Sequence, residues 1–177
     1  MLFRSVSDQF NLSGGGPAAL ANGALSPKVN TGPGSGAGNT IGDIADGTTN
    51  TLMLGEAAGR PSRWVLGKLA NASNVYRSSW ADYQASITVM GWDSTGANPD
   101  AGSGSCNAIN ITNNTDLPDG GNPGDRVRPG AQLYSFHTGG FNSLRCDGSV
   151  GFITSSTNAA VLAGLISRNG GEVNTSP

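Results

Sequence analysis

His137 and Asp147 are the residues whose types and spacing could carry chemistry. They lie in the stretch LYSFHTGGFNSLRCDGSVGFI, residues 133–153, and His137 is the single histidine of the chain. A histidine beside a carboxylate can act as a general base with an orienting partner. The same two residues could instead belong to a metal site, or to a β-hairpin that has a histidine nearby.

The spacing argues against a catalytic pair. An extended chain rises about 3.3 Å per residue, so His137 and Asp147 would lie roughly 25–30 Å apart if most of the chain between them is extended. Asp147 precedes Gly148, and an Asp-Gly pair is typical of a turn in which the carboxylate bonds the local backbone. The sequence also lacks a nucleophile signature such as G-x-S-x-G. We therefore expect His137 to end a strand and to bond a neighbouring backbone group or carboxylate, and we expect no catalytic residue.

Metal ligands are sparse in this sequence. A zinc site usually takes three or four Cys and His ligands at close spacing, and one histidine with two distant cysteines supplies this poorly. Three aspartates, Asp116, Asp119 and Asp125, lie in the Gly-rich segment TDLPDGGNPGD, and Ca²⁺ favours several oxygens on such loops. The EF-hand spacing is not met. We predict no cofactor, with Ca²⁺ at these aspartates as the weaker alternative to a solvated acidic loop.

The two cysteines, Cys106 and Cys146, are a candidate disulfide if the compartment is oxidising. The alternative is a pair of partly buried free thiols.

Composition points to a loop-rich, β-leaning extracellular or envelope protein. Charged residues make up 12% of the 177 residues, 28 residues are Gly, and the net charge is −2. Lys and Arg form no cluster, which argues against nucleic acid as a partner. No apolar run is long enough to span a membrane, so we expect no membrane contact by this chain.

The elements that must position these residues are mostly short strands. Strands are predicted over residues 51–54, 63–69, 80–92 and 106–112, and a type I′ hairpin is predicted around Asp147-Gly148. That turn would pair Cys146 with Ser149 and place apolar side chains on both faces of a covered sheet. The clearest helix is predicted over residues 158–168, ended by Asn169-Gly170-Gly171.

The start of the chain gives no periodic signal. Residues 1–40 are expected to be a flexible segment, and residues 41–177 the folded domain. The first five residues resemble a translated sequencing adapter, so they are either non-native or an ordinary short arm.

Aromatic residues offer one further function. Trp64, Trp80 and Trp92 with Tyr76 and Tyr83 could line a carbohydrate platform, although such residues more often pack in a core. A carbohydrate-binding or adhesion module is therefore the alternative function.

Four segments, in order, resemble one family. The family is the prepilin-type processing-associated H-x9-DG domain family. In chain order, the matching segments are IADGTTNTLMLGE, INITNN, HTGGFNSLRCDG and VLAGLISRNGGEV, and the third of them fits the H-x9-DG pattern. The matching positions of the H-x9-DG motif are His137, Gly139, Gly140, Asp147 and Gly148. Those of the other segments are Asp46, Gly47, Asn50, Gly55, Glu56, Asn113, Asn114, Gly170, Gly171 and Glu172.

The resemblance implies a bacterial, secreted pilin-like or pseudopilin-like protein, linked to type II secretion and without an established activity. Members of that family begin with a prepilin leader and an apolar helix, which this sequence lacks, so we expect an N-terminally truncated head. Phe141 stands where the family usually has Ala. We expect an α+β, mainly β, pilin-like head with an antiparallel sheet, long Gly-rich loops and a C-terminal helix. It would be a non-enzymatic protein of the cell envelope or exterior, with pilin-like or secretion-system subunits as partners.

Overall fold

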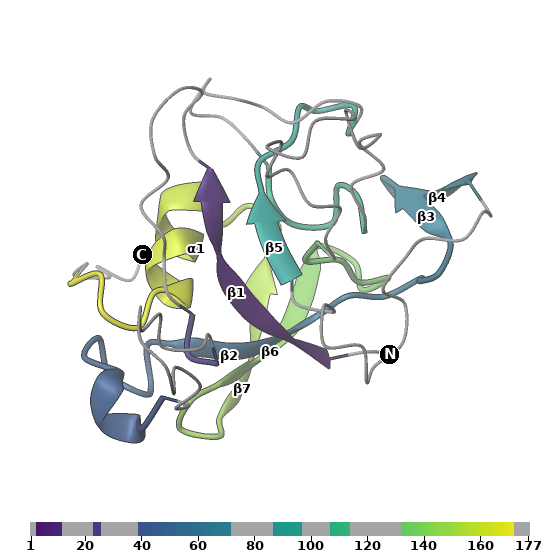
Figure 1. The fold of residues 1–177 in the computed structure, drawn as a ribbon. Coiled ribbons are helices and arrows are strands. Elements are labelled where there is room, and N and C mark those ends of the chain that lie inside the picture. The colour runs from purple at the N-terminus through teal and green to yellow at the C-terminus, as the bar shows by residue number, and fades with distance from the viewer. Residues whose placement is uncertain are drawn as a thin grey trace, which may run out of the picture.

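The chain is mainly β in the computed structural model, which describes residues 3–11, 23–25, 39–71, 87–96, 107–113 and 132–171 (Figure 1). The elements in chain order are β1 (Phe3–Asn11), the 3₁₀ helix η1 (Ile41–Asp43), β2 (Leu52–Glu56), β3 (Arg63–Val65), β4 (Lys68–Asn71), β5 (Ile87–Met90), β6 (Gly140–Arg145), β7 (Val150–Thr154) and α1 (Ala159–Ile166). The predicted fold class, mainly β with a helix near the C-terminus, is confirmed.

A five-stranded sheet in the order β5-β1-β2-β6-β7 forms the body of the molecule. The pairs β1–β2, β2–β6 and β6–β7 are antiparallel, as predicted, but β1 and β5 are parallel. Parallel neighbours need a long connection, and β2, β3 and β4 all lie between β1 and β5 in the chain. The prediction of an antiparallel sheet is therefore correct for all but this pair.

Strand β1 corrects the prediction of a flexible start. It lies between β5 and β2 in the sheet and pairs with both (Figure 1). Backbone N–H and C=O groups on both edges of β1 supply this pairing, and they do so without the apolar alternation on which the prediction relied. Residues 12–22 and 26–38 lie outside the described residues. The domain boundary at residue 41 and the non-native origin of residues 1–5 stay predictions.

The hydrophobic core lies between the sheet, α1 and the segments that follow β5. Helix α1 packs beside β1 and β2 through Leu162 and Ile166, which are both buried (Figure 1). The helix is shorter than predicted, since Ser167 and Arg168 already lie beyond its last turn. The core residues are Leu52, Ala57, Ile87, Val89, Ala108, Ile109, Leu133, Phe141, Ile153, Leu162 and Ile166.

The segment predicted as one strand over residues 63–69 is a two-stranded hairpin of β3 and β4. Val65 pairs with Lys68, and the two residues between them, Leu66 and Gly67, have φ values of 48° and 77°. Two successive positive φ values are typical of a type I′ turn, which matches the twist of hairpin strands. Leucine rarely adopts a positive φ, so the Leu66-Gly67 pair did not indicate a turn in the sequence.

The β6–β7 hairpin is confirmed, but its predicted register was wrong by one residue. Leu144 pairs with Val150, and Gly148 alone in the turn has a positive φ, 87°. A type I′ turn needs two such residues, whereas a three-residue loop ending in Gly needs one. A one-residue shift moves side chains to the opposite face of a strand. Hence Phe141 and Ile153 share the buried face.

The opposite face of the same hairpin leaves Val150 and Phe152 exposed by 68% and 50%. Strand β7 is the last strand of the sheet in the described residues. The prediction that this hairpin lies within a covered sheet was therefore wrong.

The predicted strand over residues 106–112 forms isolated bridges instead. Asn107 bridges to Trp92, Ile109 to Leu133, and Thr112 to Val65. Asn110, with φ 59°, turns the backbone in the middle of this segment. Asparagine tolerates this left-handed conformation better than most residues. No helix in the described residues is long and apolar enough to cross a membrane.

Candidate functional site

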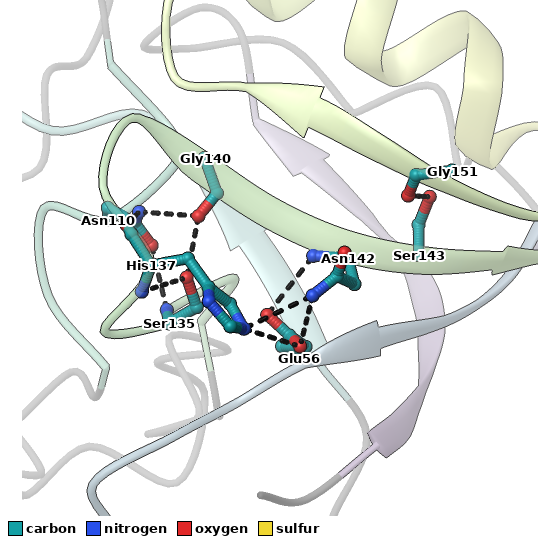
Figure 2. A network of polar contacts seen from close by, with 8 residues as sticks. All are labelled: Glu56, Asn110, Ser135, His137, Gly140, Asn142, Ser143 and Gly151. Carbon is teal, nitrogen blue, oxygen red and sulfur yellow. Dashed lines mark hydrogen bonds and ion pairs between the residues drawn. The ribbon is translucent and has the colours of Figure 1, made fainter.

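The loop that carries His137 is held in place by Asn110 and Ser135 (Figure 2). Asn110 Oδ1 accepts the Ser135 N–H at 2.7 Å, and its Nδ2 donates to the Gly140 carbonyl at 2.9 Å. The Ser135 hydroxyl donates to that same carbonyl at 2.6 Å and accepts the His137 N–H at 3.1 Å. Hydrogen bonds on both the Ser135 side and the Gly140 side thus hold the loop backbone at His137, independently of any contact of the imidazole ring.

Glu56, at the end of β2, is a fully buried carboxylate. Gly55 pairs with Ser143, so Glu56 and Asn142 are the next neighbours across β2 and β6. The Asn142 backbone N–H donates to Glu56 Oε2, and its side-chain amide donates to Oε1, both at 3.1 Å. Asn142 therefore supplies a donor to each oxygen of this buried carboxylate.

The His137 ring closes over this pair from the loop, as Figure 2 shows. Its Nε2 lies 3.5 Å from Glu56 Oε1 and 3.1 Å from Asn142 Nδ2. The His137 side chain is 49% exposed, whereas that of Glu56 is completely buried. The prediction that His137 ends a strand is wrong, because His137 lies in the loop before β6. A carboxylate does lie beside its ring, at 3.5 Å, and it is that of Glu56.

Asp147 lies at the other end of β6, in the turn before β7. The Ser149 hydroxyl and N–H both donate to its Oδ1, at 2.7 Å and 2.8 Å. These bonds, the hydroxyl's above all, hold the pKa of the Asp147 carboxyl below its usual value. Asp147 thus bonds its own turn while His137 contacts Glu56 and Asn142, so the structure does not bring the two members of the H-x9-DG motif together.

Asp46 ties the first matched segment to the end of the chain. Its carboxylate accepts the backbone N–H groups of Gly170 and Gly171 at 2.9 and 3.0 Å. Asn50 Nδ2 donates to the Asp46 carbonyl, and Gly47 (φ 91°) completes the turn.

Gly55 and Gly140 are sites of close packing. A Cβ on Gly55 would lie 2.6 Å from a methyl group of Leu133. A Cβ on Gly140 would lie 2.1 Å from the Ile153 carbonyl oxygen and 2.7 Å from the Phe152 ring. Gly140 therefore needs glycine for space, because its closest neighbour is backbone, whereas a side chain at Gly55 would require the Leu133 side chain to move.

The Asn113 side chain binds three backbone groups, two in the loop before β3 and one in β3 itself. Its Oδ1 accepts the Trp64 N–H, and its Nδ2 donates to the carbonyls of Ala58 and Ser62, all at 2.9 Å. The side chain is completely buried. Of the remaining predicted positions, Gly139 and Gly148 occupy turns with positive φ, while Asn114 and Glu172 lie outside the described residues.

Sequence reasoning missed Asn110, Ser135 and Asn142 as members of this network. Asn110 lies within the matched INITNN segment, and its tolerance of a positive φ was the available signal. Asn142 lies within the matched HTGGFNSLRCDG segment, but its role depends on the register between β2 and β6, which the sequence does not show.

The aromatic candidates divide between core and edge. Trp92 is 2% exposed and lies in the core, so the packing interpretation is confirmed for it. Trp64 donates its indole N–H to the Gly59 carbonyl and meets Phe136 edge-on at 4.9 Å. Phe136 in turn meets Tyr134 edge-on, and burial raises the pKa of Tyr134. Trp80, Tyr76 and Tyr83 lie outside the described residues.

Cys146 follows β6 and makes no disulfide with any residue that the structure describes. Burial raises the pKa of its thiol, and the charge of Asp147 adds to the effect. Cys106 lies outside the described residues, so the pairing of the two cysteines stays a prediction.

Charged metal ligands do not cluster in the described part of the chain. No group of three or more His, Cys, Asp and Glu side chains is found there. Asp116, Asp119 and Asp125 lie outside it, so calcium binding at these aspartates is a prediction still.

Comparison with known proteins gives a family match. The family described as "Protein of unknown function (DUF1559)" matches residues 11–160. The chain belongs to this family. The DUF1559 match includes Glu56, Asn110, His137, Asn142 and the Asp147 turn. No curated protein and no solved structure matches the chain.

Proposed function

We propose that this DUF1559 chain is the structural head of a pilin-like or pseudopilin-like protein of the bacterial cell envelope or exterior, and that it is not an enzyme. The H-x9-DG resemblance supports the pilin-like assignment. Its partners would be other pilin-like or secretion-system subunits, and nucleic acid and membrane would not be among them.

The observation that carries the proposal is the use of the motif side chains within the fold. Asp46 binds two backbone N–H groups near the chain end, Asn113 binds three backbone groups in and before β3, and Asp147 binds its own turn. Residues that serve a reaction leave polar atoms directed at a substrate. In this chain the side chains of these three motif residues are directed at the protein's own backbone, which favours a structural role.

The surroundings of His137 support the same conclusion. Nucleophilic catalysis would need a hydroxyl or thiol whose proton the imidazole can accept. The nearby Ser135 hydroxyl instead donates to the Gly140 carbonyl and accepts the His137 backbone N–H. Its proton is therefore already used within the loop, away from the imidazole ring.

The alternative, a carbohydrate-binding or adhesion module, has weaker support. Trp92 is in the core, and Trp64 is the candidate that remains among the described residues. Trp64 packs edge-on against Phe136, whereas a sugar platform presents an open ring face.

Localisation and cross-linking in the native bacterium test the proposal. A tagged chromosomal copy would carry a photo-cross-linking residue at exposed Val150, with buried Ile153 as the matched control position on the same strand. We expect the chain in the envelope or medium, with adducts to pilin-like or secretion-system subunits from position 150 only. Recovery in the cytosol, or adducts only to metabolic enzymes, would contradict the proposal.

A further inference from the structure

Three polar side-chain atoms lie close together where the His137 loop contacts the sheet, and the three distances between them are similar. His137 Nε2 and Glu56 Oε1 are 3.5 Å apart, and Asn142 Nδ2 lies 3.1 Å from each of them. The first distance is long for a hydrogen bond. The three atoms form a nearly equilateral triangle, in which contacts of the Asn142 amide account for two sides and the third side has no hydrogen bond.

Such a triangle is the size of one face of a metal coordination tetrahedron. Ligand atoms about 2.0–2.1 Å from a tetrahedral Zn²⁺ lie about 3.3 Å from one another. The circle through the three atoms has a radius of about 1.9 Å, so a centre at that bond length lies a little under 1 Å from their plane. We propose that His137 Nε2, Glu56 Oε1 and the Asn142 side-chain amide bind one divalent transition-metal ion.

The Asn142 amide would present its oxygen to the metal. Rotation of the amide by half a turn places Oδ1 where Nδ2 now lies, and the carbonyl oxygen is the atom of an amide that ligates. Glu56 Oε2 stays bound to the Asn142 backbone N–H, which leaves Oε1 free for the metal. The two atoms that the Asn142 amide now contacts, Glu56 Oε1 and His137 Nε2, would be the other two ligands of the metal.

Hydrogen bonds to the loop backbone already hold the His137 loop in place. Ser135 holds the His137 backbone N–H, and Asn110 holds the Gly140 carbonyl that closes the loop. Outer contacts of this kind orient metal ligands. The His137 side chain is 49% exposed, so the three atoms lie close to solvent.

The donor set selects the class of ion. An imidazole nitrogen with two oxygens at short separations suits Zn²⁺ and its neighbours in the first transition row. Ca²⁺ takes six or more oxygens at longer bonds and fits this triangle poorly. One carboxylate beside a neutral amide leaves the ion's charge only half balanced, so the binding is moderate. The bound ion joins β2, β6 and the His137 loop.

Calorimetric titration of the tag-free, chelator-treated chain with Zn²⁺ alone tests the site. The chain has one histidine, so the imidazole ring signals in an NMR titration report on His137 and nothing else. We expect one equivalent to bind at micromolar concentrations and to shift those signals. The absence of binding up to about 1 mM Zn²⁺, a free energy of about −4 kcal/mol, would overturn the proposal.

Four variants locate the binding. His137→Gln and Glu56→Gln should each weaken Zn²⁺ binding by about tenfold or more, since each removes a ligand of the ion. Asn142→Asp should tighten it, because a second carboxylate balances the charge. Asp147→Asn, the matched control, removes a carboxylate of the same motif and should leave the affinity unchanged. Equal affinity in the wild type and His137→Gln, or weaker binding by Asn142→Asp, would overturn the proposal.

Discussion

His137 Nε2, in the loop before β6, lies 3.5 Å from Oε1 of Glu56, which ends β2 and belongs to a different sequence motif. Glu56 ends the IADGTTNTLMLGE segment, and His137 begins H-x9-DG, so the two motifs meet at one buried carboxylate. Because Glu56 is completely buried while His137 is half exposed, the histidine closes the site from the solvent side. This contact gives a physical reason for a histidine at the start of the motif. The spacing between His137 and Asp147 gives none.

Asn113 should be one of the most sensitive polar positions in the chain. Asn113→Ala leaves one part-buried N–H and two part-buried carbonyls without the side chain that bonds them, and we expect it to lower the free energy of unfolding by about 2–4 kcal/mol. Urea unfolding followed by tryptophan fluorescence measures this. Asn169→Ala, at an exposed position, is the control and should stay within about 0.5 kcal/mol of the wild type. Equal stabilities of the two variants would contradict the assigned contacts.

Gly140 should not accept a side chain. In Gly140→Ala the new Cβ would lie 2.1 Å from the Ile153 carbonyl oxygen, so β6 and β7 must separate at their first pair. We expect a loss of about 3 kcal/mol or more in thermal or urea unfolding. Gly151→Ala, on the partner strand with open space around its Cβ, is the matched control and should unfold nearly as the wild type does. A Gly140→Ala variant as stable as that control would rule out this packing.

Asp147 should stabilise the hairpin in a pH-dependent way. Its folded pKa is lowered, mainly by the Ser149 hydroxyl, from a usual value of 3.8. Its contribution is therefore fully present above the unfolded pKa and is lost as pH falls through the lower folded pKa. Comparison of wild type with Asp147→Asn by urea unfolding isolates this group. The wild type should be more stable at pH 7, and the gap should narrow below about pH 4. A gap that widens in acid would contradict the assignment.

The sequence predicted elements better than it predicted their register. The mainly β class, the hairpin at Asp147-Gly148 and the helix near the C-terminus are all present, because periodicity and turn residues are local signals. The one-residue shift at that hairpin was not predictable from Asp-Gly alone, since two-residue and three-residue loops both use it. The type I′ turn at Leu66-Gly67 was missed because leucine is unusual there.

The candidate site was only half predictable for a related reason. His137 and Glu56 were both singled out from sequence segments, but nothing local pairs them. Their contact depends on the alignment of β2 with β6, which places Asn142 beside Glu56, and on the Asn110 contacts that hold the His137 loop. Strand β1 was missed because it is paired on both edges through backbone groups, and its sequence lacks the apolar alternation on which the prediction relied.

Double-mutant cycles on unfolding free energy, in buffer with chelator, test most directly whether His137 acts with Glu56 or with Asp147. The first cycle combines His137→Ala with Glu56→Gln, and the second combines His137→Ala with Asp147→Asn. We predict a coupling of about 0.5–3 kcal/mol in the first cycle, and additivity within about 0.5 kcal/mol in the second. A coupling between His137 and Asp147 as large as that between His137 and Glu56 would contradict the account.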